Sequence, residues 1–85
     1  MEAEGIEMAK RRLMLTFSEE LIRDPIIHNL GQQFNIVTNI LRADITEERG
    51  WVELELDGKD EEIEAGITWV ISRGVRVEPI GDESL

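Results

Sequence analysis

Four segments of this chain have the spacing of strands, and their positions constrain the fold more than any other feature. Residues 10–17 alternate between apolar and polar side chains, which is typical of a strand with one buried face. Residues 51–57 alternate in the same way. Residues 35–46 and 75–80 are rich in branched apolar residues and predict two further strands.

Two helices are predicted between these strands. Apolar residues at helical spacing favour one helix over about residues 25–34, and Asp24-Pro25 is a suitable start because proline is tolerated at the first helical position. The second helix is predicted over about residues 60–73, where Gly74 can adopt the left-handed conformation that ends many helices. The order is therefore β-α-β-β-α-β.

This order predicts an α+β fold, the ferredoxin-like sandwich, in which two helices cover one face of a four-stranded antiparallel sheet. The expected strand order is 4-1-3-2. Pro79 cannot donate a backbone hydrogen bond, which agrees with the last strand lying at an edge of the sheet. The second strand is then the other edge.

The second strand is apolar on both faces, unlike the first and third. Strict alternation would place one set of apolar residues toward the helices (Val37, Leu41, Ala43 and Ile45) and would leave Ile36 and Ile40 on the uncovered face. An uncovered apolar face beside a free strand edge invites another chain. We therefore expect a homodimer that forms through the edge of the second strand.

One domain is expected, because the chain has only 85 residues. The patterned residues 10–80 form this domain, and residues 1–9 and 81–85 are expected to be flexible tails. A formal net charge of −10 disfavours binding to nucleic acid or to an anionic membrane surface. No apolar run approaches the ~20 residues of a membrane span, and the acidic N-terminus is unlike a signal peptide. A cytoplasmic protein without membrane insertion is expected.

Enzymatic chemistry is not expected, and neither is a metal ion or cofactor. The chain has no cysteine, its single histidine is His28, and no glycine-rich phosphate loop precedes either lysine. Asn39 is the unusual polar residue, because asparagine is depleted inside strands. Its amide either satisfies a neighbouring backbone group or faces a ligand.

The motifs along the chain resemble those of the NIL domain family, which takes its name from the tripeptide found here as Asn39-Ile40-Leu41. The similarity also includes Asp24-Pro25-Ile26-Ile27, Leu30-Gly31, Gly50-Trp51 and the segment from Ile63 to Val77. The family is usually the C-terminal regulatory domain of the ATP-binding subunit of bacterial methionine importers. It has a ferredoxin-like fold related to the ACT amino-acid sensors.

The resemblance implies a homodimer that binds methionine or a similar amino acid near its interface, and association with a transporter complex. It points to Asn39 as a ligand-binding residue. On physical grounds, a dimer groove floored by Ile36, Ile40 and Met14 is expected to offer an apolar slot for the thioether. The alternative is an interaction module whose exposed edge docks another protein without any small ligand. No ATPase domain is present, and Met1 with its short acidic leader favours a free-standing copy of the domain.

Overall fold

The computed structural model describes residues 8–81, which form a four-stranded antiparallel sheet with strand order β2-β3-β1-β4. The expected α+β ferredoxin-like architecture and strand order are confirmed. The elements, in chain order, are β1 (Met8–Ser18), α1 (Glu19–Ile22), α2 (Ile26–Gln33), β2 (Ile36–Ile45), β3 (Arg49–Lys59), α3 (Asp60–Ser72) and β4 (Arg76–Pro79).

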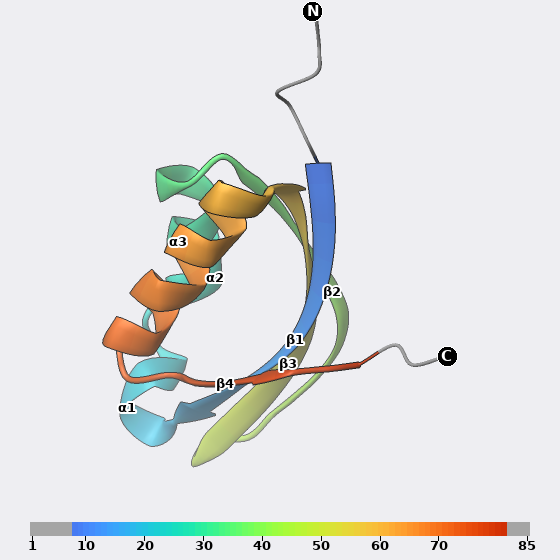
Figure 1. Cartoon of the computed structure of the whole chain (residues 1–85). Helices are drawn as coiled ribbons and strands as arrows, with labels where there is room; N and C mark the ends of the chain where they lie inside the picture. The colour runs from blue at the N-terminus through green and yellow to red at the C-terminus, as the bar shows by residue number, and fades with distance from the viewer. Residues whose placement is uncertain (1–7, 82–85) are drawn as a thin grey trace, which may run out of the picture.

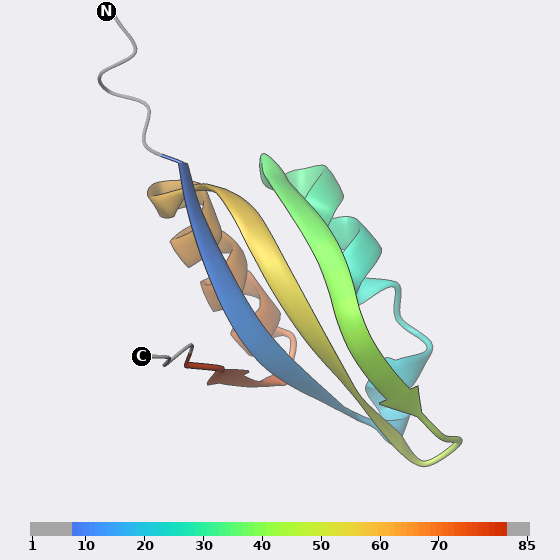
Figure 2. The ribbon, with the colours of Figure 1, turned by 90° about the vertical axis from the view of Figure 1, so that its right-hand side faces the viewer.

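The helices lie together on one side of the sheet, and the opposite side is uncovered (Figure 1). Figure 2 looks onto this uncovered side, hereafter the open face. The strands β1 and β3 lie in the middle and pair along their whole length, from Met8 opposite Lys59 to Ser18 opposite Arg49. The edges are β2 and the short β4, whose last residue is Pro79, and an edge position suits a proline because it has no N–H to donate.

The core lies between the helices and the central strands. Alternate residues of β1 and β3 point into it, because the side-chain period of a strand is two. The fully covered side chains on the strands include Leu15, Leu54 and Leu56, and Ile63 of α3 packs onto them. Burying each such side chain stabilises the fold by about 1.5 to 3 kcal/mol. The apolar residues of the alternating pattern therefore form the core layer between the sheet and the helices.

The helix α3 packs against α2 and the start of β2 through a glycine. A Cβ atom added at Gly66 would lie only 2.9 Å from the Cδ1 atoms of Ile36 and Leu30. Gly66 therefore lets the two helices approach while Ile36 fills the space between them. The helix ends at Gly74, whose φ of 96° is the left-handed conformation expected at that position.

Several element boundaries differ from the expectation. The strand β1 begins at Met8, so Met8 and Ala9 extend the sheet, where a tail was predicted. The rest of that tail, residues 1–7, and residues 82–85 lie outside the described residues. Residues 19–22, between the first predicted strand and the first predicted helix, form a short helix, α1, which ends before Pro25 because a residue preceding proline is disfavoured in helical geometry.

The expected faces are wrong for the part of β2 before its bulge and right after it, where Ala43 and Ile45 lie opposite the buried residues Val52 and Gly50. Ile36 is only 6% exposed and belongs to the core, whereas Val37 is 62% exposed and lies opposite Asp57 on the open face. A β-bulge interrupts the pairing with β3 between Ile40 and Arg42, so Leu41 is an extra residue without a partner on β3. Strict alternation fails here because a bulge shifts the phase of every residue that follows it.

The packing at Gly66 yields a test of the helix–helix contact. We expect Gly66→Val to lower the free energy of unfolding by about 1 to 3 kcal/mol, because the added methyl groups would overlap Ile36 and Leu30. The matched control is Ala65→Val, which introduces the same residue into α3 at an exposed position. Urea denaturation followed by circular dichroism measures both values. Equal stabilities of the two variants would contradict the tight packing at Gly66.

Candidate functional site

The four predicted ligand-binding residues do not lie together. Met14 and Asn39 both point to the open face, where they lie opposite Glu53 and Glu55 on β3. Ile40 pairs with Leu54 and therefore points to the helix side, although it is 58% exposed. Ile36 is in the core. An apolar floor made of Ile36, Ile40 and Met14 beside Asn39 is thus not present within one subunit.

The open face is predominantly charged. Arginines and glutamates alternate on neighbouring strands and form ion pairs between Arg42 Nε and Glu53 Oε1 at 3.0 Å and between Arg12 Nε and Glu55 Oε2 at 3.7 Å. The Arg42 guanidinium also lies over the ring of Trp51, 5.8 Å from its centroid. Each exposed ion pair of this kind contributes little to stability. Because charged side chains occupy most positions of the open face, few apolar side chains lie there.

The apolar surface lies along β2 itself. Beyond Thr38, every residue of this strand is exposed, because the helices stop short of the outer half of the strand. Ile40, Leu41 and Ile45 are 58%, 40% and 57% exposed. Within residues 8–81, no strand pairs with its outer side (Figure 2). An exposed edge with large apolar side chains is a surface suited to pairing with another strand.

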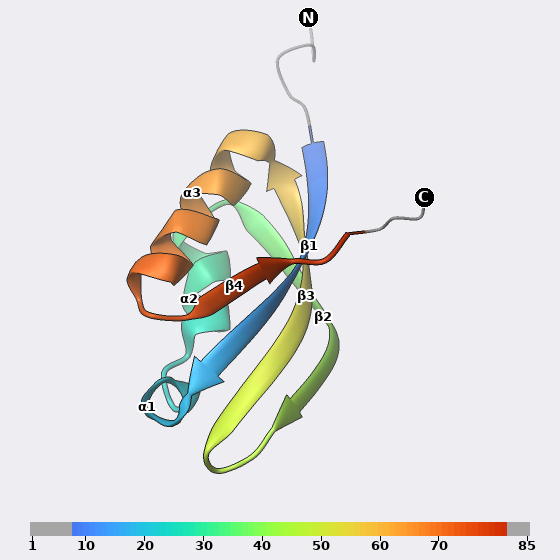
Figure 3. The same cartoon turned by 60° about the horizontal axis from the view of Figure 1, so that its bottom comes forward.

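The hairpin that joins β2 to β3 is fixed by Thr46. The Thr46 hydroxyl donates to the backbone carbonyl of Arg49 at 2.9 Å and accepts from the backbone N–H groups of Arg49 at 3.2 Å and Glu48 at 3.3 Å. Thr46 N–H also donates to the Arg49 carbonyl at 2.8 Å. These bonds tie together the end of the hairpin, which comes forward at the bottom of Figure 3. A hollow lies on each face of the sheet beside it.

The hollow on the open face, hereafter the hairpin cleft, has a volume of about 310 Å³. It combines an aromatic ring with one acidic and one basic side chain, and its lining residues are Thr16, Asp44, Thr46, Arg49, Gly50 and Trp51. The side chains of Asp44 and Arg49 form no ion pair within residues 8–81. Cross-strand pairing sets Asp44 and Thr16 on either side of Trp51.

The hollow on the helix side is smaller, about 190 Å³, and is mainly apolar. It lies where α1 and α2 leave the end of the sheet uncovered. Its walls include Phe17, Ile22, Ile27 and Ile45, with Asp24 and His28 among the polar lining residues. This hollow is continuous with the core packing and offers fewer charged groups than the hairpin cleft.

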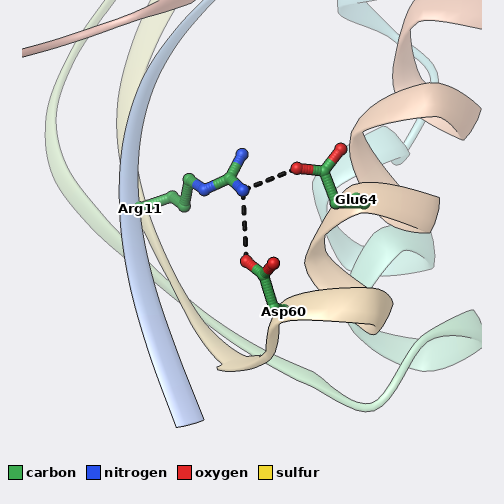
Figure 4. Close-up of polar contacts among 3 residues, drawn as sticks. All are labelled: Arg11, Asp60 and Glu64. Atoms are coloured by element: carbon green, nitrogen blue, oxygen red, sulfur yellow. Dashed lines mark hydrogen bonds and ion pairs between the residues drawn. The ribbon is translucent and has the colours of Figure 1, made fainter. Parts of the chain in front are cut away.

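A separate cluster of charged residues ties α3 to β1. The Arg11 guanidinium donates to Asp60 Oδ1 at 3.1 Å and to Glu64 Oε2 at 2.6 Å (Figure 4). The hydrogen bond to Glu64, with the charges of both carboxylates, raises the pKa of Arg11 above its ordinary value. Asp60 and Glu64 are spaced four residues apart on one face of α3, so this cluster is a structural link between the helix and the sheet.

Between residues 8 and 81, His, Asp and Glu side chains do not gather in any group of three that could hold a metal ion. No helix in the same part of the chain is long and apolar enough to cross a membrane.

The hairpin cleft was not predicted from the sequence. Its residues are spread over three segments, and Trp51 was interpreted as the start of a strand and as part of a family motif, not as a site residue. The available signal was the alternation of β3, because Trp51 shares its face with Glu53 and must therefore point away from the core. The bulge at Leu41, which brings Asp44 onto the same face, gives no such signal.

The fold and the site define a small ferredoxin-like α+β domain with one uncovered sheet face and a free apolar strand edge. The family model of the NIL domain matches residues 11–79. Among solved structures, the chain is similar to the crystal structure of the C-terminal domain of an ABC transporter / ATP-binding protein from Enterococcus faecalis. The TM-score is 0.76 and the identity 26%, and the match covers 86% of each chain. Among curated proteins, no sequence match is found. The chain belongs to the NIL domain family.

The structural role of the Arg11 cluster can be tested. We expect Arg11→Met to lower the free energy of unfolding by about 1 kcal/mol or less at low ionic strength, because exposed ion pairs are weak even when two carboxylates converge on one guanidinium. The difference should shrink in about 0.5 M NaCl, since salt screens these charges. Arg23→Met, a change on the exposed surface, is the control. A loss that does not depend on salt would contradict this interpretation.

Proposed function

We propose that this domain is a non-enzymatic regulatory module that binds methionine or a similar amino acid as a homodimer joined through β2. The proposal rests above all on one observation, the exposed apolar edge of β2 in the strand that carries the NIL tripeptide. Its cellular setting is the cytoplasm, where ATP is available to an ATP-binding subunit. There the dimer would associate with the ATP-binding subunits of a transporter.

Membership in the NIL family and the likeness to a domain of an ABC transporter ATP-binding protein support a role in transport regulation. The physical basis is coupling between ligand and dimer. A ligand that binds at the seam between two copies stabilises their association, because it contacts both copies only when they are paired. In a sensor of this kind, a change in the ligand concentration changes how the two copies are paired. The arrangement of any domains attached to the two copies changes with it.

Asn39 remains the residue through which the NIL tripeptide would contact the ligand. It is exposed on the open face of β2 and lies at the edge that the second copy would occupy. An amide offers both a donor and an acceptor, which suits the two charged groups of an amino acid. Met14 lies on the same face, one strand further in than Glu53 and Glu55.

The second candidate function is an adaptor that docks another protein along β2 without a small ligand. The same exposed edge favours it, because β-strand addition uses the free hydrogen-bonding groups of an edge strand and recognises alternate side chains. The two functions differ in one measurable property, the binding of free amino acids.

Calorimetric titration with L-methionine tests the ligand. We expect millimolar or tighter binding, weakened about tenfold by Asn39→Ala, because a hydrogen bond to a charged group contributes about 1.5 kcal/mol or more. The matched control is Gln32→Ala, which removes an exposed amide from α2. Flat heats with methionine and with the other amino acids would contradict the sensor and favour the adaptor.

Sedimentation velocity tests the dimer. We expect the unaltered chain to sediment as a dimer and Leu41→Lys to sediment as a monomer, because a charge at the centre of the paired edge would have to be buried without a partner. Ile71→Lys changes a similarly exposed apolar residue on α3 and should remain dimeric. A monomer of the unaltered chain at high concentration would contradict pairing through β2.

A further inference from the structure

We propose that the hollow on the helix side, hereafter the helix-side hollow, is a docking site for a partner protein. It would take one large apolar side chain from a segment that is otherwise rich in lysine and arginine. The site lies on the opposite side of the sheet from Asn39 and does not depend on the binding of methionine. It gives the domain a second surface, through which it can contact another protein.

The lining of the helix-side hollow is apolar from its deepest residues to its rim. Phe17, Ile26 and Val52 are each 6% exposed or less and belong to the core. Toward solvent the lining continues with Ile22, which is half-buried, and with Ile45, which is 57% exposed. Water finds few hydrogen-bonding partners on such walls, so its replacement by an apolar side chain is favourable.

The size of the helix-side hollow indicates what it can hold. Its volume of about 190 Å³ is below the range of about 300 to 1,000 Å³ that is usual for ligand pockets. A pocket of this size suits a single side chain of a protein better than a whole small molecule. Protein interfaces commonly contain such a pocket, filled by one anchoring side chain and surrounded by weaker polar contacts.

An acidic trench adjoins the helix-side hollow. It has a volume of about 810 Å³, and its lining residues are Glu19, Glu20, Ile22, Arg23 and Glu47. Ile22 of α1 lines both the trench and the hollow. The hairpin between β2 and β3 likewise contributes to both, with Ile45 in the hollow and Glu47 in the trench. Figures 1 and 3 show α1 and this hairpin at the same end of the molecule. The trench and the hollow therefore form one continuous surface.

The charges of the trench favour a basic partner. Three glutamates face one arginine there. Among residues 8–81, none of these four side chains forms an ion pair. Exposed charges at the rim of an interface attract and orient a partner of opposite charge. A lysine- or arginine-rich segment can therefore lie in the trench while its apolar side chain enters the hollow.

A second copy of this chain does not have the required charge. Its formal net charge is −10, and its longest basic run is Lys10-Arg11-Arg12. This run lies in the central strand β1, where Arg11 and Arg12 already form ion pairs with Asp60 and Glu55. An anionic membrane surface is repelled by the trench in the same way. The occupant that fits is a basic segment of a different protein.

The first test is an NMR titration of the full, isotope-labelled chain. The probe is a short synthetic peptide in which one leucine is flanked on both sides by lysine and arginine. We expect the amide signals of α1, the start of α2 and the β2–β3 hairpin to shift. Replacing the leucine by alanine should weaken binding about tenfold or more, because the hollow is then left unfilled. Addition of about 0.5 M NaCl should weaken it as well, since salt screens the trench.

The second test changes the chain. We expect Glu20→Gln combined with Glu47→Gln to weaken peptide binding about fivefold or more, because both carboxylates face the basic residues of the peptide. The matched control is Glu61→Gln combined with Glu78→Gln, which removes two exposed carboxylates outside the trench. Both double variants have the same net charge, so only the position of the lost charges differs between them.

The apolar part of the site is tested by Ile22→Gln, which places an amide between the trench and the helix-side hollow. We expect about tenfold weaker peptide binding. The control is Ile71→Gln, since Ile71 is an exposed apolar residue of α3 outside this surface. Circular dichroism of each variant verifies that the fold is retained.

The results separate this proposal from the proposed function. Equal binding of a peptide whose leucine is flanked by glutamates would overturn the assignment of a basic partner. An absence of shifts, or shifts confined to the open face and the edge of β2, would overturn the docking site and leave the sensor intact. Asn39→Ala should leave peptide binding unchanged, and a loss of peptide binding in this variant would show that the two surfaces are not separate.

Discussion

Incomplete coverage of the sheet by the helices is the constraint on which the rest of this structure depends. The close contact at Gly66 draws α3 and α2 together over β1, β3 and the beginning of β2, where Ile36 is held in the core. The outer half of β2 receives no such cover. The large apolar side chains left exposed there make this part of the strand the surface best suited to contact another molecule.

Most of the fold could be predicted because local pattern and global architecture agree. Strict alternation defines β1 and β3, the stripe of Ile63, Gly66 and Val70 defines the covered face of α3, and Gly74 marks its end. Pro79 identified one edge of the sheet correctly. Topology then followed from the order of the elements, since few arrangements bury two amphipathic helices against four strands.

The candidate site could not be predicted in the same way. Its geometry depends on the phase of β2, and a single bulged residue reverses that phase without leaving a mark in the composition. Ile36 and Val37 are equally apolar, so the sequence alone does not say which of them faces the helices. The position of Asp44 beside Trp51 could not be predicted for the same reason. Which residues of adjacent strands are neighbours can be stated only when the register of the two strands is known.

The irregularity in β2 also bears on solubility. A flat, regular, apolar edge is a template for unlimited strand addition, which leads to fibres. A bulge increases local twist, so a third strand cannot simply continue the ladder, whereas a two-fold pair of equally twisted edges closes on itself. At the opposite edge β4 is only four residues long and ends in proline. In the proposed homodimer the two β2 edges would be paired with each other, and only the short β4 edges would remain free.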